Sequence, residues 1–429
     1  MKSLRSSLIL LVLALFGGAY LFFAERGAPS RSGALVLFSA RAEQIRTIRF
    51  APSGIELRRQ DEKWRVFDPK TRRDAPADPK AVESLLQSLE KVESDAPVSN
   101  PEKLAVYGLE KPSAQIEIDR KMLSFGASPR FDPRGVYARS DDEIALLPLQ
   151  LRQTARKSFG EWRDSSILRF DAQTNDFSLQ TARGRLGFQK NGEEWRLNPL
   201  GVRADADVVN DFLTRLGAAQ ISRWFDENGA NPTKFRLDKP RAVIEIGEAK
   251  LEIGARQKEG GFAARNSASP AIWLLPDAVW ALIDQPKNHW RDKRVAVFDA
   301  ESVARLEIFD GRTSRTLLRE GDDWRLKGGK NEAKVRNAAL DLIDFARGLR
   351  ATDFAQDATK NSQPDITPPV FALKASDADG AVAFELRFER REKNLFVQSQ
   401  GSVGTLFKLE SSALDAIQIA RAQIFAPTK

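Results

Sequence analysis

Two residue types that support much of enzyme chemistry are almost missing from this sequence, which has no cysteine and one histidine. The lack of cysteine excludes disulfide bonds, thiolate nucleophiles, thiolate zinc sites and a lipid-modified N-terminal cysteine. A single histidine excludes histidine clusters and disfavours a Ser-His-Asp triad. The sequence also lacks the GxGxxG, P-loop, GxSxG and HExxH motifs. Carboxylate, lysine or hydroxyl chemistry remains available to the chain, or no chemistry at all.

Long apolar runs are scarce as well, and the one exception lies at the N-terminus. Residues 8–24 carry no charged side chain, and no comparable run follows them. At 1.5 Å per residue this run spans about 25 Å, the short end of a membrane-crossing helix. Lys2 and Arg5 precede it, so the positive-inside rule predicts a cytoplasmic N-terminus over residues 1–7. The chain beyond this anchor is then extracytoplasmic.

A cleaved signal peptide is the competing interpretation of the same run. Gly17–Ala19 fits a small-x-small cleavage site, but it sits inside the apolar run, and Phe22 and Phe23 continue past it. We therefore favour the uncleaved anchor in the cytoplasmic membrane. Both interpretations place the rest of the chain outside the cytoplasm.

An excess of one charge is also missing from most of the chain. The net charge is +8 over 429 residues, and acidic residues are interleaved with basic ones throughout. No basic run with aromatic spacing occurs. We therefore expect no nucleic-acid partner. At 42% apolar and 29% charged residues, the chain is globular in composition, and its length predicts two to four domains.

Self-comparison reveals an internal repeat with a period of 128 residues. The segment Tyr107-Gly-Leu-Glu-Lys-Pro112 matches Phe235-Arg-Leu-Asp-Lys-Pro240, and Trp162-Arg-Asp164 matches Trp290-Arg-Asp292. Trp-Arg pairs also recur at Trp64, Trp195 and Trp324. We predict three tandem modules, module 1 (38–169), module 2 (170–297) and module 3 (298–429), with residues 25–37 as a tether. No Gly/Ser-rich linker separates them, which favours a stiff array.

Each module reads as α+β, with antiparallel β-meanders and packed helices. Polar turns over 60–63, 191–194 and 320–323 predict hairpins that return through the Trp-Arg strand. A helix follows, for which Asp78 is the expected N-cap with Pro79 at the first helical position, and Asp205 repeats this role in module 2. A second set of strands and a short helix (150–159; 277–285) close the unit. We interpret this as a sheet-plus-helix layer built twice per module.

The residues that could carry chemistry each have a structural explanation that we favour. Asp164 and Asp292 recur in the Trp-Arg-Asp tract, but a glycosidase needs two carboxylates about 5–10 Å apart, and these lie on different modules. We expect instead that the tract forms a buried Arg163–Asp164 pair at the joint. His289 aligns with Glu161, so no supporting group recurs around it, and we expect a structural or surface histidine. Asp141-Asp142-Glu143 lacks calcium-loop spacing and predicts a turn.

The repeat pattern resembles a known family. A meander closing on Trp64-Arg, a helix opening at Asp78 and the Tyr107–Pro112 loop are similar to an uncharacterised domain-of-unknown-function family of membrane-anchored repeat proteins found beside gliding-motility-type ABC transporters in bacteria. The resemblance covers nearly all of residues 35–429, with module 3 the most divergent. It implies a single-pass, extracytoplasmic auxiliary protein of an ABC-type system, and it supplies no catalytic residues.

These observations favour a non-enzymatic protein that is anchored to the bacterial cytoplasmic membrane through residues 8–24 and acts by binding. Its expected partner is an ABC-type permease or its auxiliary membrane subunits. We expect no catalytic residue, no metal site and no cofactor. Two alternatives stay open: an envelope carbohydrate- or lipid-processing enzyme that uses paired carboxylates, and a rod that binds lipid or polymer.

Overall fold

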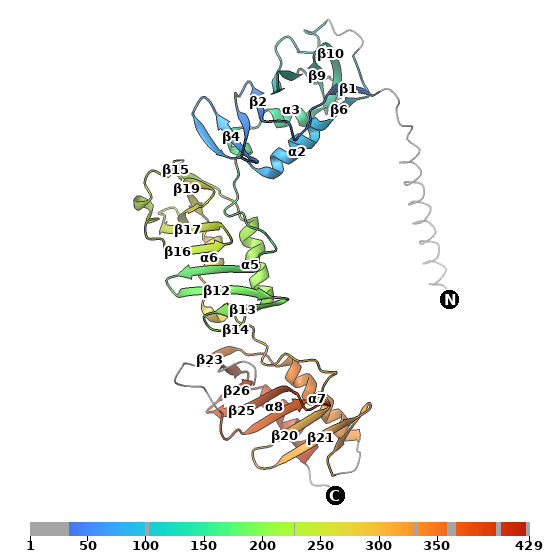
Figure 1. The fold of residues 1–429 in the computed structure, drawn as a ribbon, viewed down its shortest axis with the longest axis vertical. Coiled ribbons are helices and arrows are strands. Elements are labelled where there is room, and N and C mark those ends of the chain that lie inside the picture. The colour runs from blue at the N-terminus through green and yellow to red at the C-terminus, as the bar shows by residue number, and fades with distance from the viewer. Residues whose placement is uncertain are drawn as a thin grey trace, which may run out of the picture. The chain divides into compact units, whose positions relative to one another are not determined.

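The computed structural model describes residues 34–98, 103–226, 228–328, 333–357, 366–399 and 405–425. Three large sheets fall in the three expected modules, and each contains only antiparallel strand pairs (Figure 1). The chain divides into two compact units between Ser165 and Ser166. The first unit holds the sheet of module 1, and the second holds the sheets of modules 2 and 3.

Module 1 contains an eight-stranded sheet in the order β10-β9-β8-β7-β2-β3-β4-β5 and a two-stranded sheet of β1 and β6. The strands are β1 (Leu35–Phe38), β2 (Thr47–Ala51), β3 (Glu56–Gln60), β4 (Lys63–Asp68), β5 (Arg73–Pro76), β6 (Val92–Ser94), β7 (Ala114–Ile118), β8 (Lys121–Phe125), β9 (Gly135–Ser140) and β10 (Glu143–Pro148). The helices are α2 (Pro79–Glu90), α3 (Leu149–Ala155) and α4 (Phe159–Trp162).

Module 2 repeats this plan in a nine-stranded sheet, ordered β14-β13-β12-β11-β16-β17-β18-β19-β15. Its strands are β11 (Asp176–Thr181), β12 (Gly184–Asn191), β13 (Glu194–Asn198), β14 (Val202–Arg203), β15 (Trp224–Asp226), β16 (Ala242–Ile246), β17 (Ala249–Arg256), β18 (Phe262–Asn266) and β19 (Ser269–Leu275). Its helices are α5 (Ala206–Ala218), η1 (Thr233–Phe235), α6 (Asp277–Ile283) and η2 (Lys287–Trp290).

Module 3 has an eight-stranded sheet in the order β22-β21-β20-β24-β25-β26-β27-β23. Its strands are β20 (Arg305–Phe309), β21 (Ser314–Glu320), β22 (Asp323–Leu326), β23 (Asp353–Asp357), β24 (Phe371–Ser376), β25 (Val382–Arg391), β26 (Asn394–Ser399) and β27 (Thr405–Leu409). Its helices are α7 (Ala333–Gly348) and α8 (Ala413–Phe425), and buried Ile417 and Ile424 of α8 join the core of this module.

The α+β class is confirmed, but the two meanders of a module form one sheet instead of two separate layers. The first strand of the first meander pairs with the first strand of the second meander: β2 with β7, β11 with β16, and β20 with β24. In module 2 this pairing places Ser178 opposite Glu245. Strand pairs so distant in sequence leave no local signal, which explains why the sequence did not predict the joined sheet.

Two boundaries differ from those expected. Residues 35–37, assigned to the tether, belong to strand β1, because the buried Leu37 packs into the core of module 1 and the strand pairs with β6. The short helix expected over 150–159 in module 1 ends at Ala155, and Ser158 and Glu161 form a capping box that starts a second helix, α4. In module 2 the helix expected over 277–285 is present as α6, and η2 follows it after Pro286.

The expected helix starts are confirmed. The carboxylate of Asp78 accepts a hydrogen bond from the Lys80 amide, and that of Asp205 accepts bonds from the amides of Asp207 and Val208. These acids satisfy amide groups that a helix N-terminus leaves without partners. They are therefore structural.

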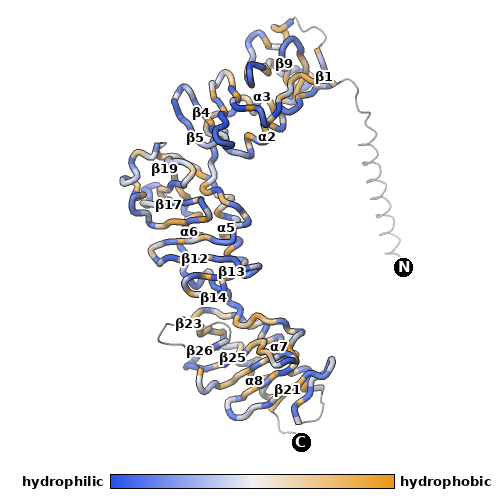
Figure 2. Tube along the Cα trace, in the orientation of Figure 1, coloured by the Kyte–Doolittle hydropathy of each residue, from blue (hydrophilic) through white to orange (hydrophobic). Residues whose placement is uncertain are grey.

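Each sheet buries one face. In module 2 the inner residues of the strands pack with α5 and α6, around side chains such as Phe177, Phe188 and Phe212. The intervening residues point to the other face and are polar, and Figure 2 shows this alternation along the strands. Because no helix of the module covers that polar face in Figure 1, it is available to a ligand or partner.

Residues 8–24, the expected anchor, lie outside the described residues. Within the part of the chain that the structure describes, no helix is both long and apolar enough to cross a membrane.

Candidate functional site

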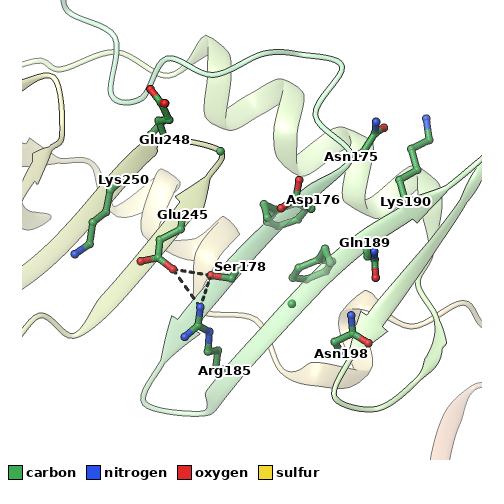
Figure 3. A pocket seen from close by; sticks show the side chains of 15 residues that line it. Asn175, Asp176, Ser178, Arg185, Gln189, Lys190, Asn198, Glu245, Glu248 and Lys250 are labelled. Atoms are coloured by element: carbon green, nitrogen blue, oxygen red, sulfur yellow. Dashed lines mark hydrogen bonds and ion pairs between the residues drawn. The ribbon is translucent and has the colours of Figure 1, made fainter.

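The open face of the module 2 sheet carries a polar hollow of about 650 Å³ (Figure 3). Its floor follows one row across five strands, where Asn198, Gly187, Ser178, Glu245 and Lys250 stand in register. Because Gly187 has no side chain and Ser178 has a short one, the surface along this row lies below the longer side chains beside it. The rim includes Asn175, Asp176, Gln189, Lys190 and Glu248.

A hydrogen-bonded group lies on one side of the hollow. The Ser178 hydroxyl donates to Glu245 Oε2 at 3.1 Å, and Arg185 Nη2 lies 3.2 Å from the same carboxylate oxygen (Figure 3). Arg185 also donates to Ser178 Oγ at 3.3 Å. The side chains of Arg185 and Glu245 are 64% and 45% exposed. Because water reaches this group, it lacks the dry surroundings in which fixed charges stabilise a transition state strongly. The arrangement suits the binding of a polar ligand or surface.

A second charged group continues the face beyond Lys250. Glu252 lies 2.9 Å from Lys250 Nζ and 2.5 Å from Arg265 Nε, and its side chain is 15% exposed. Burial by itself raises the pKa of Glu252, but the hydrogen bonds from Lys250 and Arg265 outweigh it and hold the pKa below its ordinary value of 4.5.

This lowered pKa predicts a pH-dependent stability. A carboxyl group with a lowered pKa in the folded state stabilises the fold above its ordinary pKa, and the contribution is lost as the pH falls through the folded pKa. We expect Glu252→Gln to reduce the free energy of unfolding by about 1 kcal/mol near neutral pH. The difference from the parent shrinks once the pH falls below 4.5. Urea unfolding at several pH values measures it, with exposed Glu248→Gln as control; a pH-independent difference contradicts the assignment.

The other modules show that the hollow is specific to module 2. By strand register, the positions of Gly187 and Ser178 are occupied by Glu56 and Arg49 in module 1. Arg49 lies within 3.4 Å of both Glu56 and Glu117, so long paired side chains fill the space there. In module 3 the corresponding residues are Thr316 and Glu307, and Glu307 stands opposite Lys374.

This comparison supplies a variant that fills the hollow without breaking the fold. A Cβ atom added to Gly187 meets only Asn198 Cβ, at 3.5 Å, an ordinary contact. We expect Gly187→Glu combined with Ser178→Arg to change the free energy of unfolding by less than about 1 kcal/mol, since substitutions on exposed faces usually have small effects. Thermal unfolding measures this. A larger loss means that the row cannot accept the side chains of module 1.

The Trp-Arg-Asp tracts form joints instead of a catalytic pair. Each tract forms a bridge with the residue before the N-cap of its own module's helix, as Arg163 does with Ala77 and Arg291 with Ala204. Trp162 and Trp290 are fully buried. Asp164 and Asp292, the acids weighed for catalysis, belong to the first and the second compact unit, respectively.

The second joint, residues 290–295, shows how these side chains are used. Asp292, buried in the second unit, lies 3.3 Å from Arg203 Nε and 2.9 Å from Arg294 Nη2. Arg291 is also buried, and its guanidinium lies 3.8 Å from the centre of the Phe354 ring and donates to Thr405 Oγ1. Arg291 therefore ties module 2 to module 3. The expected buried pair was Arg163–Asp164, and there Arg163 is buried but Asp164 is only half-buried. At the equivalent position of the second tract the acid, Asp292, is buried, and it is ion-paired with Arg203 and Arg294.

The remaining candidates lie in structural positions. His289 is exposed in η2, and its ring meets the Trp290 ring at 86°. Partial desolvation of the imidazole by its neighbours and the charge of Lys293 lower the pKa of His289, and Asp205 opposes them. Asp141 and Asp142 form the turn between β9 and β10, as expected. Over the described residues, no group of three or more His, Asp or Glu side chains could hold a metal ion.

Sequence reasoning missed Ser178, Arg185 and Glu245. Their only signal was the alternation of polar and apolar residues along β11, β12 and β16, which marks an exposed face but does not identify a site. The missing side chain at Gly187 matters only once the strand register is known.

A family model described as a domain of unknown function, DUF4340, matches the chain twice, over residues 64–240 and 195–369. The two matches together include more than half of the chain. The chain belongs to the DUF4340 family. The expected family of repeat proteins of unknown function is thereby confirmed. Each match starts at a Trp-Arg pair, Trp64 or Trp195, and runs through a Trp-Arg-Asp joint into the next module. The DUF4340 unit thus spans a joint.

No curated protein matches the chain. Among solved structures, the crystal structure of a DNA polymerase sliding clamp from Pseudomonas aeruginosa is 8% identical, with 87% of this chain and 93% of that chain covered. Its TM-score is 0.14, which carries no argument about fold or function.

Proposed function

We propose that this DUF4340 protein is a non-enzymatic, single-pass protein of the bacterial cytoplasmic membrane whose modules lie outside the cytoplasm and act by binding. The hollow of module 2 is its contact surface. The observation that carries the binding function is the open, charge-paired sheet face on which Gly187 and Ser178 replace the long side chains of module 1. A partner with polar groups of its own can form hydrogen bonds and ion pairs with Arg185, Lys190 and Lys250 there.

The structural use of the recurring acids supports a non-enzymatic function. Asp78 and Asp205 cap helices, and Asp292 is held by two arginines. A general acid or base needs a position from which it reaches the substrate, and the buried Asp292 is enclosed by its own joint.

The membrane and transporter parts of the proposal rest on the sequence. The charge-free run 8–24 supports the anchor. The family resemblance supports an ABC-type permease, or its auxiliary membrane subunits, as the partner for which the protein is an auxiliary or scaffold component.

Crosslinking in native membranes tests this function. The full chain and the filled variant, Gly187→Glu with Ser178→Arg, are crosslinked and purified side by side. We expect the parent to recover a membrane subunit of a transporter and the filled variant to recover severalfold less. Equal recovery with both chains contradicts the assignment of the surface, and recovery of no membrane protein with either contradicts the proposed partner.

A further inference from the structure

The two most exposed large apolar side chains of the described residues lie on neighbouring loops of module 1. Phe131 is 79% exposed and Val106 is 68% exposed. Phe131 lies between β8 and β9, and Val106 lies before β7. Single exposed apolar residues are common on soluble proteins, but two on adjacent loops form a feature that needs an explanation.

The two loops are packed against each other. The Ala127 amide donates to the Tyr107 carbonyl at 2.8 Å, and the rings of Tyr107 and Tyr137 lie 4.8 Å apart. Gly126 permits this approach, because a Cβ atom there would stand 2.1 Å from the Tyr107 carbonyl oxygen. The loops therefore form one continuous surface, which we call the Phe131 surface: residues 103–111 and 127–135.

Hydrogen bonds fix the loop that carries Phe131. The Asp132 amide donates to the Pro129 carbonyl, and Asp132 Oδ1 accepts from the Arg134 amide at 3.1 Å. The Arg134 carbonyl accepts from the Leu149 amide at 2.8 Å. The ring of Phe131 is thus held out from the surface by an ordered loop.

Exposed basic residues lie in the same two loops as the apolar residues. The exposed basic residues of the Phe131 surface are Lys103, Lys111, Arg130 and Arg134, and its acids are Glu110 and Asp132. Asp132 is committed to its own loop. An aromatic ring flanked by exposed cations matches the boundary between anionic headgroups and acyl chains.

The repeat provides an internal comparison. At the 128-residue offset, Val106 corresponds to Lys234. The module 2 loop that corresponds to the Phe131 loop, residues 255–261, carries exposed Lys258 and Glu259 at its tip. Module 2 therefore lacks the apolar tips of module 1, the module that follows the proposed anchor.

The position of module 1 in the chain limits its distance from the membrane. Nine residues, 25–33, separate the proposed anchor from Ala34, and nine extended residues reach at most about 30 Å. The chain then enters β1, which packs beside β9 and β10 in the same unit as the Phe131 loop (Figure 1).

We infer that the Phe131 surface of module 1 inserts into the anionic lipid interface of the membrane that anchors the chain. Phe131 and Val106 enter the interface, and Arg130, Arg134, Lys103 and Lys111 pair with lipid phosphates. This inference rests on the membrane anchor of the proposed function. The contact would fix module 1 at the bilayer.

The absence of cysteine makes the test specific, because any introduced cysteine is the only one. Phe131→Cys and the control Glu259→Cys are each made in the full chain, labelled with an environment-sensitive fluorophore and reconstituted into vesicles. The vesicles contain phosphatidylcholine alone or with phosphatidylglycerol. In anionic vesicles we expect the label at 131 to shift to the blue, to be quenched by nitroxide lipids and to be severalfold less accessible to iodide than the label at 259.

Additional variants and outcomes distinguish a lipid contact at position 131 from a protein contact and from a missing anchor. Adding Arg130→Gln and Arg134→Gln should remove the difference between anionic and neutral vesicles at position 131. A chain that floats with vesicles while both labels are equally accessible to iodide overturns the inference but keeps the anchor. A label at 131 that is shielded only in native membranes indicates a protein partner and also overturns it. A chain that fails to float overturns the anchor and the inference together.

Discussion

Replacing Trp290 with alanine should strongly lower the stability of the second unit. Trp290 is fully buried, and its ring meets Phe188 at 5.2 Å and Phe212 at 5.1 Å in edge-to-face contacts. Removing a buried tryptophan typically costs 3–5 kcal/mol, so we expect a loss of about 4 kcal/mol. For a unit of this size, the thermal midpoint should fall by about 8–15 °C.

Two control variants sharpen this prediction. Trp290→Phe should keep most of the stability, because the indole Nε1 has no hydrogen-bond partner within the described residues. Trp280→Ala removes a half-buried tryptophan from α6 and should cost less than half as much. Equal losses at positions 280 and 290 would contradict the view that the joint tryptophan anchors the core of module 2.

Replacing Asp292 with asparagine should give the second large effect. The change leaves Arg203 and Arg294 without the carboxylate that both contact, while the shape of the side chain is kept. Hydrogen bonds to charged groups contribute about 1.5–3 kcal/mol, so we expect a loss of about 2 kcal/mol in unfolding free energy. Asp207→Asn, an exposed acid in the first turn of α5, is the matched control and should have little effect.

The same variant separates a structural acid from a catalytic one. We expect Asp292→Asn to lower the thermal midpoint by about 4–8 °C. Unchanged stability, combined with loss of an activity on an envelope carbohydrate or lipid, would instead support the enzyme hypothesis.

The elements that the sequence predicted well are those with local signals. Asp78 followed by Pro79 marks a helix start because an N-cap carboxylate and a first-turn proline act within one turn. The turns at Gly192 and Gly321 were predictable for the same reason, because both residues have positive φ. The internal repeat also predicted module boundaries, and these lie close to the limits of the three sheets.

The features that were missed depend on pairing between distant residues. Arg203 precedes Asp292 by 89 positions, and Ser178 meets Glu245 across strands 67 positions apart. In an extended segment such as 291–292, neighbouring side chains point to opposite sides, so Arg291 reaches Phe354 while Asp292 faces Arg203. The neighbouring positions of Arg and Asp in the Trp-Arg-Asp tract therefore did not predict which residues each side chain contacts at the joint.

The central claim is that the hollow of module 2 contacts a membrane partner, and photo-crosslinking from single positions tests it most directly. A photoreactive residue replaces Lys250 in the hollow or Met122, its counterpart by strand register in module 1. The full chain is then irradiated in native membranes. We predict that the probe at position 250 links to a membrane subunit of an ABC-type transporter and that the probe at position 122 does not. Equal linkage from both positions, or none from position 250, would contradict the account.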